Sequence, residues 1–396
     1  MKTHVTPVRG RAELTAFLRL SQRLYRDDPY WVAPLEREQR MLLNPRRNPF
    51  FDTGSARLFL ARRGTGRGAP VLGRIAVARD PRFVDEEGAP YGVFGFFECA
   101  EDITVAAALF EAAEEWLADS GAATLRGPLG FTTNEECGLL VDGFAHAPTL
   151  MTAYNPPSYP GLLEGCGFTK AKDLYSWLLH AEPEGRLPER IGRLADAVRR
   201  LEGVTVRPLD PADFGREAAR IRDIYNRAWA RNWGAVTMSD REFAHLAARL
   251  KPLVRRGLAL FAEVDGEPVA FALGVPDLNQ ALRPVRGRLT TWGLPLGLLR
   301  LVRGMRRIDT GRLVALGVQH EFRGRGLETV LYTELQRLAL ERGFRRYELS
   351  WTLEDNTSVN RAIEAAGGSV YRTHRIYRRP IPAQRAASAA PAPVQS

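Results

Sequence analysis

The chain has 396 residues, of which 45% are hydrophobic and 26% charged, and this composition is typical of a globular protein with a sizeable core. A chain of this length usually forms two domains or one large one. No apolar run is long enough to span a membrane, and the N-terminus lacks the apolar stretch of a secretory signal. The three cysteines have neither metal-ligand nor disulfide spacing, so we expect a cytoplasmic protein without a bound metal.

The formal net charge of +10 raises the question of a nucleic-acid partner. Lysine occurs at only four positions, so nearly all of the positive charge comes from arginine. Together with the many alanines and glycines, this bias is typical of a GC-rich genome. No recognisable nucleic-acid-binding module accompanies the charge, and we therefore expect no specific nucleic-acid partner.

Residues 1–182 have the hydrophobic periodicity of a complete α/β lobe. We expect strands at residues 4–8, 56–61, 71–78, 93–97, 123–126 and 172–179. We expect helices at residues 12–25, 103–118 and 160–165. Gly121 ends the second of these helices, as a C-cap glycine would. Residues 183–203 follow as a linker helix.

Residues 204–380 repeat the same order of elements. We expect strands at residues 204–208, 258–263, 268–275, 312–318, 345–351 and 370–377. We expect helices at residues 216–229, 328–342 and 356–366. The repeated order predicts two α/β lobes that arose by duplication. The tail at residues 381–396 is rich in alanine, proline and serine, which predicts disorder.

A glycine-rich loop, Arg323-Gly324-Arg325-Gly326-Leu327, lies between an apolar strand and an amphipathic helix of the second lobe. Its glycines allow the backbone to approach a ligand closely and to adopt positive φ. The free amides of the first helical turn point towards a bound anion, and the helix dipole favours negative charge there. Arg323 and Arg325 can add charge-assisted hydrogen bonds. This context favours a pyrophosphate-binding loop over a basic surface turn.

These residues resemble the coenzyme A motif of the GCN5-related N-acetyltransferase superfamily, which is Gln/Arg-x-x-Gly-x-Gly/Ala after the fourth strand. Arg323, Gly326, the preceding strand and the following helix match, whereas Glu328 stands where the family usually has a small residue. The resemblance covers residues 204–378. It implies that each lobe is a mixed, mostly antiparallel sheet flanked by helices. It also implies that the second lobe binds acetyl-coenzyme A or another acyl-coenzyme A.

In the resembled fold, the strand after the cofactor helix splays away from the strand before the loop, and the thioester arm lies between them. The backbone near Leu316 and Val318 would then pair with the pantetheine, and an amide near Val318 would polarise the thioester carbonyl. Asn356 stands where the family often has an asparagine that contacts the cofactor. An asparagine at a helix start is equally explained as an N-cap, and the two interpretations are compatible.

Acylation of an amine requires a neutral nitrogen, and hence a general base or a water relay. Glu354, just beyond the end of a predicted strand, is our first candidate for the base. His320 and Glu321, which flank the cofactor loop, are alternatives. Each of the three, taken singly, is also explained as a solvated loop residue.

The leaving thiolate needs a proton donor unless it is released directly. The resembled family often uses a tyrosine seven residues after the helix-starting asparagine, which is Asn356 here. That position is occupied by Ile363. Tyr371 or Tyr377 would therefore have to serve as the acid.

Aromatic and amide side chains predict the acceptor site. Trp229, Asn232 and Trp233 follow the first helix of the second lobe, a region that walls the acceptor site in the resembled fold. Trp351, on the strand that precedes the predicted base, is a further candidate for contact with the acceptor. A core position for these aromatic side chains is the competing interpretation.

The first lobe has a different loop at the equivalent place, residues 99–104. This loop contains no glycine and carries two acids, Glu101 and Asp102. Carboxylates repel a pyrophosphate, so we expect the first lobe to be degenerate and to bind no coenzyme A.

An insertion at residues 278–311 precedes the cofactor strand. It contains an amphipathic helix with one apolar and one arginine-rich face. Such a helix can make a peripheral membrane contact through residues 293–307, or it can cover an acyl pocket. Packing on its own domain is the commoner arrangement for a helix of this kind.

These features predict an acyl-coenzyme A-dependent N-acyltransferase, most simply an N-acetyltransferase, that acts on a small-molecule or peptide amine. Two alternatives stay open. The missing tyrosine suits a non-catalytic acyl-coenzyme A sensor. Tandem lobes with basic charge also resemble the aminoacyl-tRNA-dependent transferases that build peptidoglycan cross-bridges, although the intact pyrophosphate loop favours coenzyme A. The acceptor, the acyl length and the oligomeric state are not assigned by the sequence.

Overall fold

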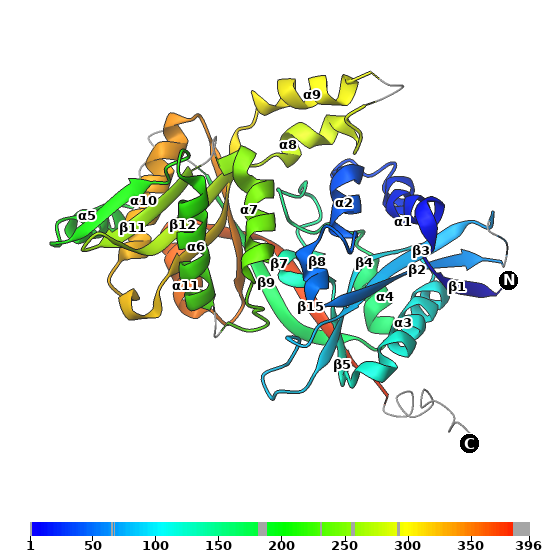
Figure 1. Ribbon diagram of the computed structural model, residues 1–396. Coiled ribbons are helices and arrows are strands. Elements are labelled where there is room, and N and C mark those ends of the chain that lie inside the picture. Colours follow the sequence, from blue (N-terminus) through cyan, green and yellow to red (C-terminus); the bar gives the residue numbers. More distant parts are fainter. Residues whose placement is uncertain are drawn as a thin grey trace. The chain divides into compact units, whose positions relative to one another are not determined.

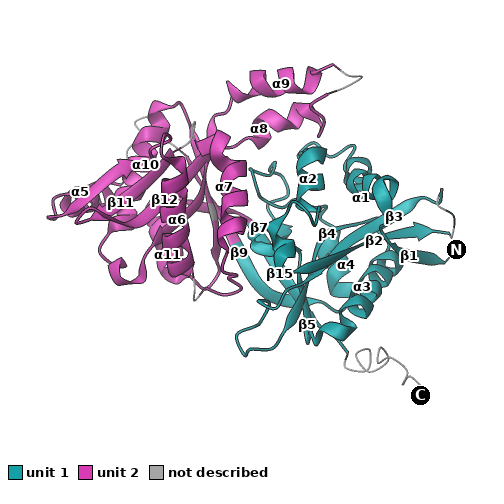
Figure 2. Ribbon diagram, viewed as in Figure 1, with its two compact units in different colours: residues 1–174, 373–396 teal, residues 175–372 magenta. Residues whose placement is uncertain are grey.

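The computed structural model describes residues 2–64, 66, 68–180, 188–229, 232–254, 258–290 and 294–382. The chain divides into two compact units (Figure 2). The first unit comprises residues 1–174 and 373–396, and the second comprises residues 175–372. Parts of the predicted linker helix and of the predicted tail, residues 183–187 and 383–396, lie outside the described residues.

The first unit is a mixed β-sheet with helices packed against it (Figure 1). Its strands are β1 (Thr3–Pro7), β2 (Ser55–Arg63), β3 (Val71–Arg79), β4 (Tyr91–Cys99), β5 (Thr124–Gly127), β6 (Leu129–Gly130), β7 (Thr132–Cys137), β8 (Leu139–Asp142), the first half of β9 (Thr169–His180) and residues 373–380 of β15 (Ser369–Pro380). Its helices are α1 (Gly10–Leu24), α2 (Glu36–Leu42), α3 (Ile103–Leu117) and α4 (Tyr159–Gly165), with short 3₁₀ turns η1 (Pro49–Asp52) and η2 (Ala118–Ser120). Neighbouring strands from β1 to β4 are antiparallel, whereas β4 and β5 are parallel.

The second unit repeats this order of elements. Its strands are the second half of β9, β10 (Val204–Pro208), β11 (Leu258–Val264), β12 (Glu267–Pro276), β13 (Thr310–Val318), β14 (Arg346–Leu353) and the start of β15 (Ser369–Pro380). Its helices are α5 (Glu189–Arg199), α6 (Phe214–Trp229), α7 (Asp240–Val254), α8 (Asn279–Leu282), α9 (Leu296–Met305), α10 (Leu327–Glu341) and α11 (Thr357–Ala365), with η3 (Arg283–Val285) and η4 (His320–Phe322). Strands β10 to β13 are antiparallel, and β13 and β14 are parallel.

Each unit connects the two strands of its parallel pair through a helix. Helix α3 joins β4 to β5, and α10 joins β13 to β14. Two parallel strands need a crossover of this kind, because the chain must return to the end of the sheet where the first strand began. A tight turn joins only antiparallel strands. The repeated order and strand directions confirm the predicted fold class, in which each of two α/β lobes has a mixed, mostly antiparallel sheet flanked by helices.

The division of the chain differs from the predicted one at the last strand. We predicted that residues 204–380 form one lobe, but residues 373–380 of β15 belong to the first unit. Residues 373–375 pair there with β8, and residues 377–380 pair with β5. Arg375 reinforces this placement through a bidentate ion pair with Asp173 of β9, at Nε–Oδ1 and Nη2–Oδ2 distances of 2.7 and 3.0 Å. The alternation of apolar and polar side chains predicts a strand but not the strands with which it pairs. The sequence therefore could not show that the end of β15 belongs to the first unit.

Two helices of the second unit pack on opposite faces of its sheet. The side chain of Leu335 on α10 lies over Gly274 of β12, whereas Trp229 at the end of α6 contacts Phe271 of the same strand. Residues an odd number apart on a strand point to opposite faces, so α10 and α6 sandwich the sheet. Gly343 follows the C-cap residue of α10, and its φ of +82° allows the chain to turn away from the helix.

The C-terminal end of β14 is held against α11 by largely buried polar side chains. Trp177 Nε1 donates to Thr352 Oγ1 at 2.9 Å, and the Thr352 hydroxyl donates to Asn360 Oδ1 at 2.6 Å. Asn360 Nδ2 donates in turn to the carbonyl oxygens of Leu353 and Glu354, at 3.1 and 3.4 Å. This chain of hydrogen bonds fixes the turn that follows β14.

Sequence patterns missed several elements, of which α7 carries a local signal. Ser239 and Glu242 form a capping box at its start. The Ser239 amide donates to the Glu242 carboxylate at 2.8 Å, and the Glu242 amide donates to the Ser239 hydroxyl at 3.3 Å. Within the described residues, no helix combines the length and the apolar character needed to cross a bilayer.

Replacing Thr352 with valine should destabilise the second unit. The change nearly preserves the side-chain shape but leaves the Trp177 N–H and the Asn360 carbonyl oxygen without partners. An unsatisfied buried polar group costs about 1–3 kcal/mol, and we expect a loss of that size in the free energy of unfolding, measured in urea by tryptophan fluorescence. Thr352→Ser keeps the hydroxyl and should lose less. Equal losses for the two variants would contradict the role of the hydroxyl.

Candidate functional site

Strands β13 and β14 lie side by side over only the first part of their lengths. Their parallel ladder joins residues 310–313 to residues 346–349 and, in the described chain, ends there. On its other edge β13 stays paired with β12 as far as Val318. A register shift against β12 gives β13 one extra residue, Val314, immediately after the last pair with β14. The second half of β13 therefore keeps an edge that is not paired with β14.

The loop between β13 and α10 presents a run of backbone amides. Gly324 and Gly326 are left-handed, with φ of +75° and +78°. The N–H groups of residues 324–328 donate to no acceptor within the described residues. The cap residue of α10 is Gly326, which has no side chain to accept from these amides. The positive end of the helix dipole is thus left open to a ligand.

Gly326 also allows the close packing of its loop. A Cβ atom at this position would lie only 2.8 Å from Val198 Cγ2 of α5. A Cβ atom at Gly324 would meet no atom within 4 Å. Glycine is therefore required for both conformation and space at position 326, and for conformation alone at position 324.

The two arginines of the loop differ in what they contact. Arg323 donates from Nε to the carbonyl oxygen of Val318 at 3.3 Å and from Nη2 to that of Ala228 at 2.5 Å. These bonds tie the loop to the ends of β13 and α6, so Arg323 supports the loop from behind. Arg325 is exposed, and its guanidinium carbon lies 4.9 Å from the centre of the Phe322 ring. Arg325 is the arginine whose donors remain available to an anion.

Asn356 stands immediately before α11, but its side chain does not cap the helix. Its Oδ1 atom accepts from the Ser358 hydroxyl at 3.3 Å, and its Nδ2 group has no partner within the described residues. Asn356 therefore occupies the N-cap position of α11, but its side chain does not form the hydrogen bond that an N-cap residue usually makes. Ile363, at the position of the family's tyrosine, is buried in the core of the unit.

The three predicted catalytic residues lie on three different elements. Glu354 is half-buried in the turn after β14, and His320 is exposed on η4 after β13. Because β13 and β14 are parallel, both residues lie at the same edge of the sheet as the amide loop. Tyr371 lies on β15, and β9 separates that strand from β14. The structure places Glu354 and His320 at the end of the sheet that carries the loop and leaves Tyr371 two strands away from β14.

The predicted acceptor residues lie on or after α6 and on the diverging part of β14. Trp229 covers Gly317 of β13, where a Cβ atom would lie 2.5 Å from Trp229 Cζ3. In the segment after α6, Asn232 is exposed and Trp233 is half-buried. Trp351 is half-buried on the part of β14 that has left β13. Trp229 is thus a packing residue that also walls the end of β13.

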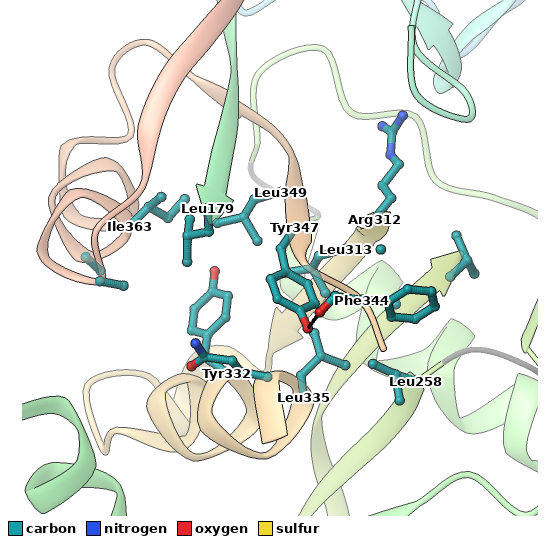
Figure 3. Close-up of a pocket in the computed structure, with 16 residues that line it drawn as sticks. Leu179, Leu258, Arg312, Leu313, Tyr332, Leu335, Phe344, Tyr347, Leu349 and Ile363 are labelled. Carbon is teal, nitrogen blue, oxygen red and sulfur yellow. Dashed lines mark hydrogen bonds between the residues drawn. The ribbon is translucent and has the colours of Figure 1, made fainter. Parts of the chain in front are cut away.

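An apolar pocket begins where β13 and β14 part and extends beneath α10 and α11 (Figure 3). Its cavity volume is about 60 Å³, and the pocket is partly open to solvent. Leu313 and Leu349, the last paired residues of the two strands, line it together with Leu335 and Ile363. Burial raises the pKa of Tyr332, which also faces the pocket, to about 12. The sequence could not predict the pocket, because its walls come from segments that are distant in the chain.

The equivalent region of the first unit is occupied by its own residues. The Asp102 carboxylate caps α3, accepting from the Thr104 amide at 2.9 Å and from the Thr104 hydroxyl at 2.6 Å. These hydrogen bonds lower the pKa of Asp102, so a negative charge stands where α10 is open. Where β4 and β5 part, a Cβ atom at Gly95 would lie 1.9 Å from the Leu129 carbonyl oxygen. Strand β6 therefore fills the space beside β4.

Comparison with known proteins agrees with this arrangement. Residues 218–367 match the model of the acetyltransferase (GNAT) family. The chain is 35% identical over 385 residues to the bacterial ceramide synthase of Caulobacter vibrioides, covering 95% of this chain and 97% of that protein. It is 33% identical over 377 residues to protein YghO of Escherichia coli, covering 94% of each.

A solved structure shows the same fold. The tandem GNAT protein from the clavulanic acid biosynthesis pathway superimposes with a TM-score of 0.56 at 16% identity, covering 96% of this chain and 99% of that one. A likeness at this level of identity concerns the fold alone. With two units of one topology and relatives along nearly its whole length, the chain belongs to the GCN5-related N-acetyltransferase superfamily, in its tandem form.

Proposed function

We propose that this protein is an acyl-coenzyme A-dependent N-acyltransferase that joins a fatty acyl group to the amine of a long-chain amino alcohol. The observation that carries the proposal is the run of unpaired amides at residues 324–328, at the start of α10. Consecutive N–H groups at a helix N-terminus bind phosphate oxygens well, and coenzyme A carries a diphosphate. Among the alternatives, this donor set favours coenzyme A over aminoacyl-tRNA.

The residues around the loop suit the other parts of coenzyme A. Arg325 supplies an exposed positive charge beside the amides, and Arg323 positions the loop. The edge of β13 that β14 has left offers the backbone of Leu316 and Val318 to the pantetheine arm. The Asn356 amide nitrogen is available at the start of α11. Acyl-coenzyme A, when bound, supplies a thioester carbonyl that an amine can attack.

In the proposed reaction, a C–N bond forms while the C–S bond of the thioester breaks. Glu354 is the proposed general base that takes the proton from the amine nitrogen, with His320 as the alternative. Ile363 cannot donate a proton and Tyr371 lies two strands away from β14, so the thiolate takes a proton from water. An amide near Val318 polarises the carbonyl oxygen.

The acceptor is proposed to lie against the residues that follow α6. Trp229, Asn232 and Trp233 form one side of this site, and Trp351 forms the other from β14. Aromatic faces of this kind bury hydrocarbon well, while the Asn232 amide can bind hydroxyl groups. This mixture suits an amine that carries both a long chain and an alcohol.

The substrate class rests on a relative and on the pocket. The Caulobacter protein is named a ceramide synthase, and a ceramide is the amide of a fatty acid and a long-chain amino alcohol. The apolar pocket begins at Leu313 and Leu349, where an acyl chain would continue from a thioester lying between the two strands. Each buried CH₂ contributes about 0.8 kcal/mol, so such a pocket favours long acyl groups over acetyl.

Gly324→Asp should weaken coenzyme A binding by about 10- to 100-fold, because a carboxylate beside the amide loop repels the diphosphate. Gly324→Asn is the matched control. It has nearly the same size, tolerates positive φ equally well and carries no charge. Isothermal titration calorimetry with coenzyme A should show one site per chain, since the first unit is filled by its own residues. Two sites per chain, or equal affinities for the two variants, would count against this assignment.

Glu354→Gln should lower the rate of thiol release from palmitoyl-coenzyme A and sphinganine by about 10²- to 10⁴-fold, as expected for loss of a general base. Its affinity for coenzyme A should stay unchanged. His320→Gln is the companion variant, and a loss confined to it would move the role to His320. If the wild-type protein binds coenzyme A but releases no thiol with any long-chain amine, the protein is a sensor and the proposed reaction is wrong.

Leu335→Trp should shift the acyl preference towards shorter donors. The larger side chain fills the pocket beneath α10, so turnover of palmitoyl-coenzyme A should fall more than turnover of octanoyl-coenzyme A, compared at equal enzyme. Leu335→Met conserves volume and should leave the ratio of the two rates near that of the wild type. An unchanged ratio in a folded Leu335→Trp protein would show that the acyl chain lies elsewhere.

A further inference from the structure

Helix α9 carries apolar side chains outward. Leu298, Leu299 and Val302 are 45%, 57% and 49% exposed. Leu294 and Leu296, at its N-terminal end, are 57% and 36% exposed. These are five of the ten large hydrophobic side chains that are exposed in the described chain. We call these five residues the outer face of α9. At about 100° per residue, Leu298, Val302 and Leu299 span an arc of about 100°.

The inner side of α9 is formed largely by glycine. A Cβ atom at Gly297 would lie 2.0 Å from the Arg288 carbonyl oxygen, and one at Gly304 would lie 2.9 Å from Ala281 Cα. The helix therefore packs through its backbone on the segment that contains α8 and η3 (Figure 1). Glycine inward and leucine outward is the reverse of a helix that covers its own core. A contiguous apolar surface of this kind marks an interaction site.

Positive charge borders the outer face. Between Asp277 and Asp309 the sequence contains seven arginines and no acid. The exposed arginines on α9 and at its C-terminal end are Arg300, Arg303, Arg306 and Arg307. Their guanidinium groups form no ion pair within the described residues. Around the helix axis, three of these arginines follow Leu299 on one side, which is the pattern of a helix that lies in a membrane interface.

We propose that the outer face of α9 docks on an anionic lipid bilayer. The apolar side chains insert among the lipid headgroups, and the arginines extend along the surface to bind phosphates. Charge complementarity selects this partner. A second copy of the chain, docked through the same face, would bring like-charged arginines together without acids to neutralise them. The inference rests on α9 alone and does not depend on the proposed reaction.

Full-length protein sedimented with lipid vesicles tests this inference. We expect binding to phosphatidylcholine vesicles that contain phosphatidylglycerol, and little binding to phosphatidylcholine alone. Binding should weaken as salt rises, because ions screen charges at the surface. Arg300→Gln and Arg303→Gln should each weaken partitioning about fivefold, since one arginine near an anionic surface contributes about 1 kcal/mol.

Charged substitutions on the outer face separate insertion from simple attraction. Leu299→Glu and Val302→Glu should reduce vesicle binding by at least about tenfold. Each removes hydrocarbon that would be buried in the bilayer and adds a negative charge that the anionic lipids repel. Leu201→Glu is the control, because Leu201 is equally exposed, at 53%, and lies outside this face. It should bind as the wild type does.

Three results would overturn the inference. Leu299→Glu and Val302→Glu could bind vesicles as well as Leu201→Glu does. The wild-type protein could bind neutral and anionic vesicles equally, or neither. Analytical ultracentrifugation could show a wild-type dimer that Val302→Glu converts to a monomer, which would assign the face to a second copy of the chain. Thiol release, measured in detergent without vesicles, reports on the reaction separately.

Discussion

Within the described residues, the parallel ladder between β13 and β14 stops after residues 313 and 349, and the proposed site of the second unit is built around that point. Beyond it, one edge of β13 is left without β14, and a ligand or solvent has to satisfy its polar groups. The hydrogen bonds from Trp177 through Thr352 to Asn360 hold the end of β14 on its own side. Arg323 holds the loop after β13 on the other. The hydrogen bonds of Thr352, Asn360 and Arg323 thus fix the ends of β13 and β14.

The two units differ in what occupies this region and not in topology. In the first unit, the Asp102 carboxylate accepts from the Thr104 amide at the start of α3, and β6 lies against Gly95 of β4. In the second, Gly326 caps α10 without a side chain, and a pocket opens beneath the sheet. Asp102 and β6 are part of the chain, so they occupy this region of the first unit without having to bind from solution. The chain therefore contains one unit in which this region is filled by its own residues and one in which it is open.

Local patterns in the sequence predicted the repeated α/β lobes and the glycine loop, because strand periodicity, helix caps and loop glycines all act over a few residues. The same patterns contained the capping box of α7, from Ser239 to Glu242, although the helix was not predicted. The support role of Arg323 depends on the carbonyl of Ala228, nearly a hundred residues away, and could not be predicted. The pocket likewise requires the relative positions of α10, α11 and the sheet.

The exchange of β15 has a consequence for biosynthesis. The first unit needs residues 373–380, which pair with β8 and β5 and carry the Arg375 partner of Asp173. A ribosome delivers these residues last, so the N-terminal unit cannot complete its sheet until the whole C-terminal unit has been translated. Multidomain chains usually fold from the N-terminus as they emerge. Here the first unit waits with an unpaired strand edge, and a chain that terminates before residue 373 leaves the sheet of this unit incomplete.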